Sequence, residues 1–232
     1  MNNNLINKNI KINRKVFVPT GTTGLLIDSA LKQIKKNHLK ILDVGCGSGV
    51  IGISIYKSLN QKNKIYFSDI SRHACKNTLE NCKKFKIKCE VRQGDNLVPW
   101  KNETFDYIIS DIAAISKEIS NFTNWYKNCE NNSGIDGTKH VIKFIKTVRN
   151  NLNKKGSFIF PIISLSNERK ILYYLKRNFK NIKKIKSQIW PMPKEIINKE
   201  KLLYKLKKKS VINFENKMGI LTFKTDIYCV KK

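Results

Sequence analysis

Acidic residues are scarce in this sequence. Only 17 of its 232 residues are Asp or Glu, against 46 Lys and Arg, so the formal net charge is +29 at neutral pH. Lysine makes up 40 of the 46 basic residues, a bias that an AT-rich genome produces without selection for charge. Such drift does not by itself remove acids, and their shortage favours a polyanionic partner. Residues 169–209 are the most basic segment, with 15 Lys or Arg against two acids, Glu195 and Glu200. The alternative interpretation is a solvated, lysine-rich surface.

Long apolar runs, leader-like segments and clustered metal ligands are also missing. No run of about 18 apolar residues occurs, so no transmembrane helix is expected. The first residues, 1–5, lack the charged-then-apolar layout of a signal peptide, which predicts a cytoplasmic protein. The six cysteines form no Cys-x-x-Cys pair and the three histidines are scattered, so no metal site is expected. Three cysteines spaced by seven (75, 82 and 89) are interpreted as small hydrophobes, two of them on one helix face.

The most informative segment is residues 41–49, Ile-Leu-Asp-Val-Gly-Cys-Gly-Ser-Gly. An apolar strand pattern ends near an acid, three glycines follow at alternate positions, and the apolar helical pattern of 50–59 comes next. Glycines suit a tight strand-to-helix turn because no Cβ keeps the backbone away from a ligand. The free N–H groups at the start of the helix favour a carboxylate or another anion.

Strand-like and amphipathic helical segments alternate along most of the chain. The predicted strands are 39–44, 64–68, 87–92, 105–110 and 157–162. The predicted helices are 50–59, 72–85, 139–152 and 167–179, preceded by one that the polar turn 20–24 opens. The helix 72–85 is expected to bury Cys75, Leu79 and Cys82. This alternation predicts an α/β fold in which helices cover both faces of a parallel sheet.

The two ends of the chain differ from this pattern. Residues 1–15 are rich in Asn and Lys and are predicted to be a flexible extension of a single domain, 16–232. Near the C-terminus the sequence predicts a strand (182–189), a break at Trp-Pro-Met-Pro, a basic helix (194–208) and short strand-like runs. These runs are 211–214 with 219–224, and 226–230. Residues 190–224 are therefore expected to form an insertion before the last strand.

Three acids indicate which nucleotide cofactor the glycine turn holds. Residues 47–52 satisfy the dinucleotide pattern Gly-x-Gly-x-x-Gly. An NAD site usually has an apolar residue where Asp43 stands, and a carboxylate there suits an ammonium group and repels a pyrophosphate. Asp69, at the end of the second strand, can accept hydrogen bonds from both ribose hydroxyls. Asp95, just past the third strand, can meet an adenine amino group.

With Asp43, the glycines, Asp69 and Asp95 in this order and spacing, residues 16–232 resemble the class I S-adenosylmethionine-dependent methyltransferases. The resemblance implies a Rossmann-like, doubly wound seven-stranded sheet, mostly parallel, with an antiparallel last strand. It implies S-adenosylmethionine as the cofactor, with Asp43 and the glycines at its methionine end. The expected cofactor-binding residues are Thr20, Thr22, Asp43, Gly45, Cys46, Gly47, Gly49, Asp69, Ile70 and Asp95. The alternative is a glycine turn in an unrelated α/β fold.

Within that superfamily the chain is most similar to the small-domain group, which includes glutamine methyltransferases of translation release factors and several ribosomal RNA base methyltransferases. Residues 19–22, 105–111 and 134–137 carry this likeness. The group's acceptor motif is an Asn or Asp, two prolines and an aromatic residue, whereas Ile-Ala-Ala follows Asp111 here. Asp111 is the expected catalytic residue, orienting or deprotonating an acceptor. Alternatively, it only caps the following turn.

The segment 116–134 reads as a long polar loop at the end of a strand, where substrate contacts often lie. Its aromatic residues Phe122, Trp125 and Tyr126 are the expected substrate-binding residues, because they can stack on a base or pack on a peptide. The alternative is that they anchor a lid on the core. Trp190 either edges the acceptor cleft or turns the chain.

Together these features predict a methyltransferase that acts on a component of the translation machinery, either RNA or a ribosome-associated protein. Its mechanism is a direct in-line methyl transfer for which the protein chiefly supplies alignment. A small-molecule methyltransferase and a non-catalytic RNA-binding module that keeps the cofactor fold are the alternatives. The sequence does not indicate an oligomeric state.

Overall fold

The computed structural model describes residues 9–59, 62–112, 115–127, 129 and 131–232. A single sheet of eight strands forms its centre, in the order β3-β2-β1-β4-β5-β8-β6, with β7 paired to β8. The strands are β1 (Lys40–Val44), β2 (Lys64–Asp69), β3 (Cys89–Gln93), β4 (Phe105–Ser110), β5 (Leu152–Ile163), β6 (Asn181–Pro191), β7 (Glu215–Lys217) and β8 (Ile220–Lys231). The strands β1 to β5 are parallel and β8 is antiparallel to β5 and β6. The predicted α/β class and antiparallel last strand are therefore confirmed.

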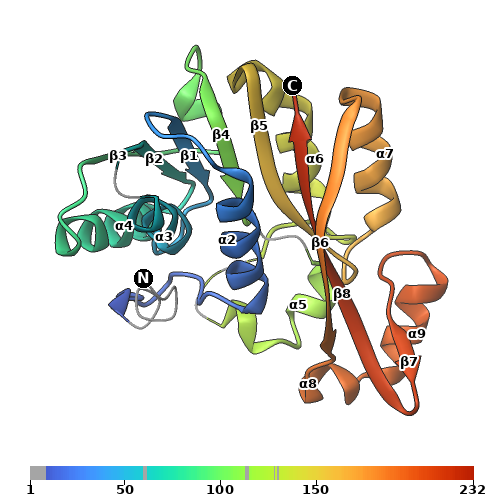
Figure 1. Cartoon of the computed structure of the whole chain (residues 1–232). Helices are drawn as coiled ribbons and strands as arrows, with labels where there is room; N and C mark the ends of the chain where they lie inside the picture. Colours follow the sequence, from blue (N-terminus) through green and yellow to red (C-terminus); the bar gives the residue numbers. More distant parts are fainter. Residues whose placement is uncertain (1–8, 60–61, 113–114, 128, 130) are drawn as a thin grey trace.

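Helices cover both faces of this sheet (Figure 1). The α-helices are α2 (Gly21–Gln33), α3 (Val50–Ser58), α4 (Arg72–Lys84), α5 (Lys117–Ser120), α6 (Lys139–Thr147), α7 (Glu168–Asn178), α8 (Lys194–Ile197) and α9 (Glu200–Lys208). Consecutive strand residues point to opposite faces, so Ile41 packs with α2 and α3 while Leu42 packs with α6 and α7. Two cores, one on each face, hold the sheet between them.

The C-terminal part of the chain adds a third apolar cluster. Buried residues of α8, α9 and β8, with Ile212 and Phe214 just before β7, pack there against Ile115 and Ile119, which belong to the segment after β4. Part of the wall beside the ends of the parallel strands is thus built by residues far apart in the sequence.

The structure corrects three expectations about the C-terminal segment. The predicted helix 194–208 is two helices, α8 and α9, with Lys199 in a non-helical conformation between them. Residues 211–214 are not a strand. The runs expected at 219–224 and 226–230 are one continuous strand, β8, because β6 continues to Pro191 and pairs with it along its length. The proposed limits of the insertion, 190–224, stay a prediction.

Helix α4 differs from the prediction in what it buries. Leu79 was expected on its buried face, but that side chain is 48% exposed. Cys75 and Cys82 are buried as expected, and two asparagines, Asn77 and Asn81, are buried with them. A polar buried face needs hydrogen-bond partners, and another segment of the chain provides them.

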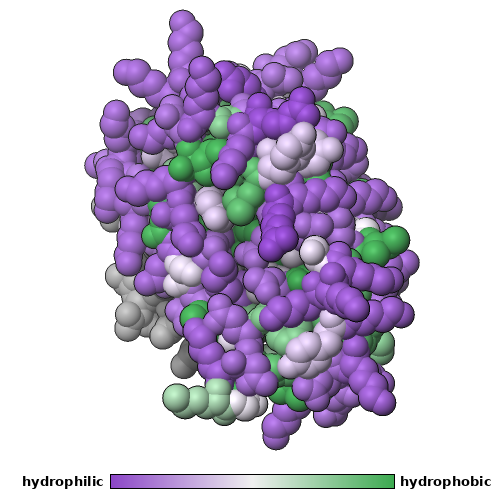
Figure 2. Space-filling model, turned by 90° about the vertical axis from the view of Figure 1, so that its right-hand side faces the viewer, coloured by the Kyte–Doolittle hydropathy of each residue, from purple (hydrophilic) through white to green (hydrophobic). Residues whose placement is uncertain are grey.

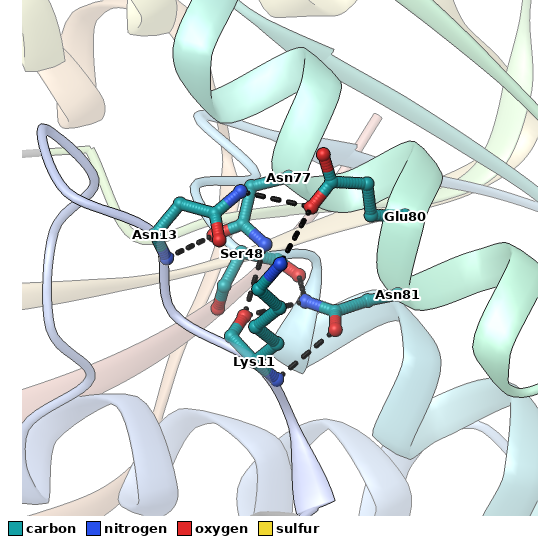
Figure 3. Close-up of polar contacts among 6 residues, drawn as sticks. All are labelled: Lys11, Asn13, Ser48, Asn77, Glu80 and Asn81. Atoms are coloured by element: carbon teal, nitrogen blue, oxygen red, sulfur yellow. Dashed lines mark hydrogen bonds and ion pairs between the residues drawn. The ribbon is translucent and has the colours of Figure 1, made fainter.

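That segment is residues 9–17, which we call the N-terminal strap. Asn81 accepts a hydrogen bond from the Lys11 backbone N–H (3.0 Å) and donates to the Lys11 carbonyl (2.8 Å). Asn77 accepts from the Asn13 backbone N–H (2.9 Å) and also donates to the Lys11 carbonyl (2.9 Å). Figure 3 shows these side chains of α4 converging on the strap. The described part of the predicted N-terminal extension thus follows α4, while residues 1–8 lie outside the described residues.

None of the helices in the described ranges is long and apolar enough to cross a membrane.

Candidate active site

The glycine turn lies between β1 and α3 in a conformation that glycine permits. Gly45, Gly47 and Gly49 all have positive φ values, 73°, 56° and 78°, which residues with a Cβ rarely adopt. The N–H groups of Gly45 and Cys46 both donate to the Ser68 carbonyl at the end of β2, at 2.8 and 3.0 Å. The turn is therefore tied to the neighbouring strand and exposes its backbone to the space above the sheet.

Asp43 lies beneath this turn. It is fully buried, and its Oδ2 accepts a hydrogen bond from the Gly52 N–H at 3.0 Å. Its Oδ1 has no hydrogen-bond partner among the described residues. Burial raises the pKa of Asp43 to about 7. The carboxyl group thus supports the start of α3 from below, and neither it nor Gly49 forms part of the wall of the cleft described next.

A cleft of about 1130 Å³ opens above the carboxyl ends of the parallel strands. This is the edge at which α/β sheets usually bind ligands, and the volume exceeds that of most single small-molecule sites. Eight of the ten predicted cofactor residues line it: Thr20, Thr22, Gly45, Cys46, Gly47, Asp69, Ile70 and Asp95. The structure therefore brings together residues from four separate segments that the sequence pattern had singled out.

Asp69 stands at the end of β2 beside the glycine turn. Its Oδ2 accepts a hydrogen bond from the Gly47 N–H (3.0 Å) and its Oδ1 accepts one from the Ser71 N–H (2.8 Å). Burial nevertheless raises the pKa of Asp69. A carboxylate offers about four acceptor positions, so the two oxygens retain capacity for hydroxyl donors of a ligand.

Asp95 lies at the more open end of the cleft, after β3. It forms an ion pair with Lys143 of α6 and accepts a hydrogen bond from Asn96 (2.8 Å). The Lys143 ammonium lowers the pKa of Asp95. Ile70 is nearby in the sequence, and its side chain is 63% exposed although it lines the cleft. An apolar side chain left open in this way suits a flat apolar ring.

Asp111 follows β4 and is in the wall of the same cleft. Its Oδ2 accepts a hydrogen bond from the Thr23 hydroxyl at 2.7 Å, and no partner of Oδ1 is found in the described part of the chain. Burial raises the pKa of Asp111 to about 6. Thr23 also accepts a hydrogen bond from the Thr20 N–H (3.2 Å), so the first turn of α2 fixes the position of this carboxyl group.

Aromatic side chains form the wall on the Asp111 side. Trp125 and Tyr126 line the cleft, together with Trp190 and Phe223. Trp125 packs against Phe223, with ring centroids 5.6 Å apart. Trp125 and Tyr126 therefore pack against other segments and also line the cleft, and their contact with a substrate stays a prediction. Phe122 is not part of the cleft wall, and its ring lies under the Lys199 ammonium, 5.3 Å away.

The N-terminal strap ends at the cleft. Lys15, Val16 and Phe17 contribute to its wall, and the Phe17 ring packs on Tyr126 at 5.4 Å between centroids. Asn81, which binds the strap, also donates to the Ser48 carbonyl in the glycine turn (2.9 Å). The strap therefore connects the glycine turn on one side of the cleft to the aromatic loop on the other.

Sequence patterns missed several residues of this wall. Val16, Phe17, Thr23 and Phe223 belong to it, and they come from both ends of the chain. Trp190 was not missed: the break Trp-Pro-Met-Pro marks a chain reversal that can edge a cleft, and Trp190 does line this one. Trp190 donates its Nε1–H to the Thr225 hydroxyl (3.0 Å).

No cluster of three or more metal-ligating side chains occurs among the residues that the structure describes.

Comparison with known proteins finds likenesses in the segment that forms much of this cleft. Residues 19–111 match the family model described as Methyltransferase small domain. The chain is 29% identical over 180 residues to a release factor glutamine methyltransferase of Borreliella burgdorferi, covering 75% of this chain and 62% of that protein. It is 24% identical over 151 residues to a tRNA1(Val) (adenine(37)-N6)-methyltransferase of Actinobacillus pleuropneumoniae, covering 63% of this chain and 61% of that protein.

A likeness in fold accompanies these matches. A 16S rRNA N2 G1207 methyltransferase of T. thermophilus, solved in complex with AdoMet and guanosine, superposes with a TM-score of 0.60 at 10% identity, over 93% of this chain and 44% of that chain. The resemblance to small-domain methyltransferases is therefore confirmed, and the fold is that of Rossmann-like methyltransferases. The chain spans less than two thirds of the length of the curated relatives named above.

Proposed function

We propose that this chain is an S-adenosylmethionine-dependent methyltransferase that acts on a component of the translation machinery. The observation that carries the proposal is the cleft, in which the glycine turn, Asp69 and Asp111 open onto one space inside the segment that matches the methyltransferase family. The relatives methylate release factors or tRNA, according to their names. An activity on RNA or on a ribosome-associated protein follows from these likenesses.

The residues of the cleft fit this cofactor. A Cβ at Gly45 or Gly47 would add bulk and strain at positive φ values in the turn, so the turn keeps its backbone open to a methionine end. In this proposal Asp69 accepts hydrogen bonds from the ribose hydroxyls, Ile70 contacts the adenine ring and Asp95 meets the adenine amino group, since all three line the cleft. Buried carboxylates raise the affinity of a site for cations, and the cofactor carries a sulfonium and an ammonium group.

Asp43 is proposed to act indirectly. Its contact with Gly52 holds the start of α3, and the negative charge below the turn favours a cation above it. This role differs from a direct contact with the methionine end, because Asp43 is not part of the cleft wall.

On the acceptor side, Asp111 is proposed to orient the nucleophile. When bound, S-adenosylmethionine supplies a methyl group already activated on a sulfonium. The chain then has to hold a nucleophilic atom in line with that methyl group and exclude water. Oδ1 of Asp111, for which the described residues supply no partner, can accept a hydrogen bond from an N–H or O–H group of the acceptor. Trp125 and Tyr126 supply the flat apolar surface that is missing from residues 112–114.

The direct test is incubation of the purified protein with methyl-labelled S-adenosylmethionine and cell extract, followed by separate counting of RNA, protein and small metabolites. Label in RNA or in a ribosome-associated protein is the expected result. Label in small metabolites alone would mean a small-molecule methyltransferase, which the missing proline pair and aromatic residue after Asp111 favour. Cofactor binding without any transfer would support the non-catalytic RNA-binding alternative.

A further inference from the structure

We infer that the edge of the sheet formed by β6, together with α9, is a docking surface for the phosphate backbone of RNA. We call this surface the lysine edge and define it by Lys183, Lys186, Lys201, Lys205 and Lys208, all of them exposed. The inference names the partner of the proposed methyltransferase and rests on that proposed function.

Positive charge is concentrated around this edge. Residues 169–209, which form α7, β6, α8 and α9, hold 15 Lys or Arg and two acids, a net charge of +13 out of +29 for the chain. This share is large for 41 of 232 residues. Genome-wide lysine drift does not explain it, because drift acts on the whole chain evenly. Figure 2 shows that this side of the molecule is mostly hydrophilic, with several smaller apolar patches between the hydrophilic side chains.

The lysines of the lysine edge have no acidic partner in the part of the chain that the structure describes. Lys184, their neighbour on β6, pairs with Asp226 (3.5 Å). In the described ranges no acid lies within ion-pair distance of the five members of the lysine edge themselves. Lys201, Lys205 and Lys208 follow one another at helical spacing on α9. Like charges at this spacing destabilise a helix, so an anionic ligand across them would relieve a built-in repulsion.

Lysines on an edge strand have another known use, which is to prevent strand-to-strand aggregation. That use accounts for Lys183 and Lys186 on β6. It does not account for α9, which has no free strand edge to protect and carries the same charge.

RNA fits this surface better than an acidic protein does. Lysine is depleted in protein–protein interfaces, which need an apolar centre, whereas it serves well as a point charge for phosphate. Tyr204, 46% exposed on α9, adds a ring on which a base can stack.

The lysine edge also leads to the acceptor side of the cleft. The strand β6 that carries Lys183 and Lys186 ends at Trp190 and Pro191, and both of these line the cleft. Trp190 is paired in register with Phe223, which lines the cleft as well. A nucleic acid strand held along this edge would therefore present its nucleotides next to Asp111 and the aromatic wall.

The test measures binding of a fluorescein-labelled RNA hairpin by anisotropy over a range of salt concentrations. One variant, called the face variant, removes charge from the lysine edge by changing Lys183, Lys186, Lys201 and Lys205 to Gln. The control variant removes the same charge at the opposite edge of the sheet, by changing Lys62, Lys64, Lys83 and Lys88 to Gln; these four are also exposed. Each lost phosphate contact lowers the slope of log K against log salt by about 0.7 to 0.9.

The dissociation constant of the face variant for the RNA is expected to be at least about tenfold higher than that of the unmodified chain, and the magnitude of its salt slope to be lower by roughly 3. The control variant is expected to have a dissociation constant and a slope close to those of the unmodified chain. Equal losses in both variants, or none in the face variant, would overturn the inference. Competition by polyglutamate as effective as competition by unlabelled RNA would overturn it in favour of an acidic protein. Calorimetry with S-adenosylmethionine distinguishes failure of this inference from failure of the proposed function. If the unmodified chain does not bind the cofactor, the proposed methyltransferase function is refuted, whereas the RNA-binding result is unaffected.

Discussion

At the scale of single residues, the carboxyl groups around the cleft have distinct environments. Asp69 binds two backbone N–H groups and Asp111 binds a hydroxyl, while Asp43 is enclosed below the turn with one oxygen that no described residue contacts by a hydrogen bond. Asp95 is the exception, since Lys143 neutralises it. The first three therefore have the unmet charge that would favour a cationic ligand.

Replacing Asp69 by Ala should weaken binding of S-adenosylmethionine by roughly 100-fold, because two charge-assisted hydrogen bonds to the ribose are worth on the order of 1.5 kcal/mol each. Isothermal titration calorimetry measures this. A matched control is Asp106→Asn at the start of β4, where the carboxylate also accepts a backbone N–H (2.8 Å, from Lys40) but lies outside the cleft wall. Unchanged affinity in Asp69→Ala would refute the ribose contact.

The raised pKa of Asp111 predicts how stability depends on pH. A carboxyl group whose folded pKa is about 6, against a usual 3.8, binds more protons in the folded state between these values. Its stabilising contribution is thus complete below pH 4 and is lost as the pH rises through about 6. In urea unfolding without cofactor, the unmodified chain should lose on the order of 1 to 3 kcal/mol between pH 4 and pH 8 relative to Asp111→Asn. A constant difference between the two proteins would contradict this.

Much of the residue-level site was predictable, for a physical reason. The glycine turn and the acids after β2, β3 and β4 are local signals, because each follows a strand whose end meets the same edge of a parallel sheet. Asp43 was predictable as part of the motif but not as a buried support, since its depth depends on how α3 packs. Phe122 was wrongly expected at the cleft because a loop sequence does not show which aromatic residue turns inward.

At the scale of elements, the N-terminal strap is the least expected part of the site. Four hydrogen bonds join Lys11 and Asn13 to the two buried asparagines of α4. The sequence offered no local signal for this contact, because the strap has no regular secondary structure over most of its length and its partners are 64 to 70 residues away.

Replacing Asn81 by Ala should therefore have two effects. It removes the hydrogen bonds to Lys11 and to the Ser48 carbonyl, which should cost about 2 kcal/mol in the free energy of unfolding. It should also weaken cofactor binding about fivefold, since the strap carries Val16 and Phe17 into the cleft wall. Urea unfolding and calorimetry measure the two effects separately.

A matched control is Asn151→Ala. Asn151 is also buried and donates to two carbonyls, those of Trp100 (2.7 Å) and Glu103 (2.9 Å), but it lies outside the cleft wall. This control should lose similar stability and bind the cofactor normally. Equal cofactor affinity in Asn81→Ala and Asn151→Ala would show that the strap plays no part in the site.

The regular elements were predicted better than the C-terminal ones. Strand 105–110 has the predicted bounds, and the helices expected at 139–152 and 167–179 begin within one residue of their prediction. The strand expected at 157–162 begins five residues earlier, and the segment expected to be a loop at 116–134 contains the short helix α5. The segment after β6 was misread because its strand boundaries depend on pairing between β6 and β8, which are separated by two helices. Long-range pairing of this kind leaves only a weak trace in a single sequence.

At the scale of the whole molecule, the wall of the cleft is formed by the segment that matches the family model together with residues from both ends of the chain. The family match covers residues 19–111, whereas the strap precedes it and Trp190 and Phe223 follow it. The sheet order explains this, because β8 lies next to β5, β6 lies next to β8, and residues of both line the cleft. The matched segment alone is thus expected to lack the wall beside Asp111.

A ligand that contacts both ends should stabilise the folded chain as a unit. At a cofactor concentration 100 times the dissociation constant, the gain is about 2.7 kcal/mol, which corresponds to a rise of roughly 5 to 10 °C in Tm for a chain of this size. Differential scanning fluorimetry measures the shift. ATP, which shares the adenosine part, is the control and should give a much smaller one.

The central claim is that the cleft binds S-adenosylmethionine, and calorimetric titration of the purified chain with this compound and its demethylated product tests it most directly. We predict one-to-one binding of both in the micromolar range, weakened roughly 100-fold in Asp69→Ala and kept in Asp106→Asn. The absence of measurable heat with either compound at any concentration up to the millimolar range, confirmed by an unchanged Tm, would contradict the account.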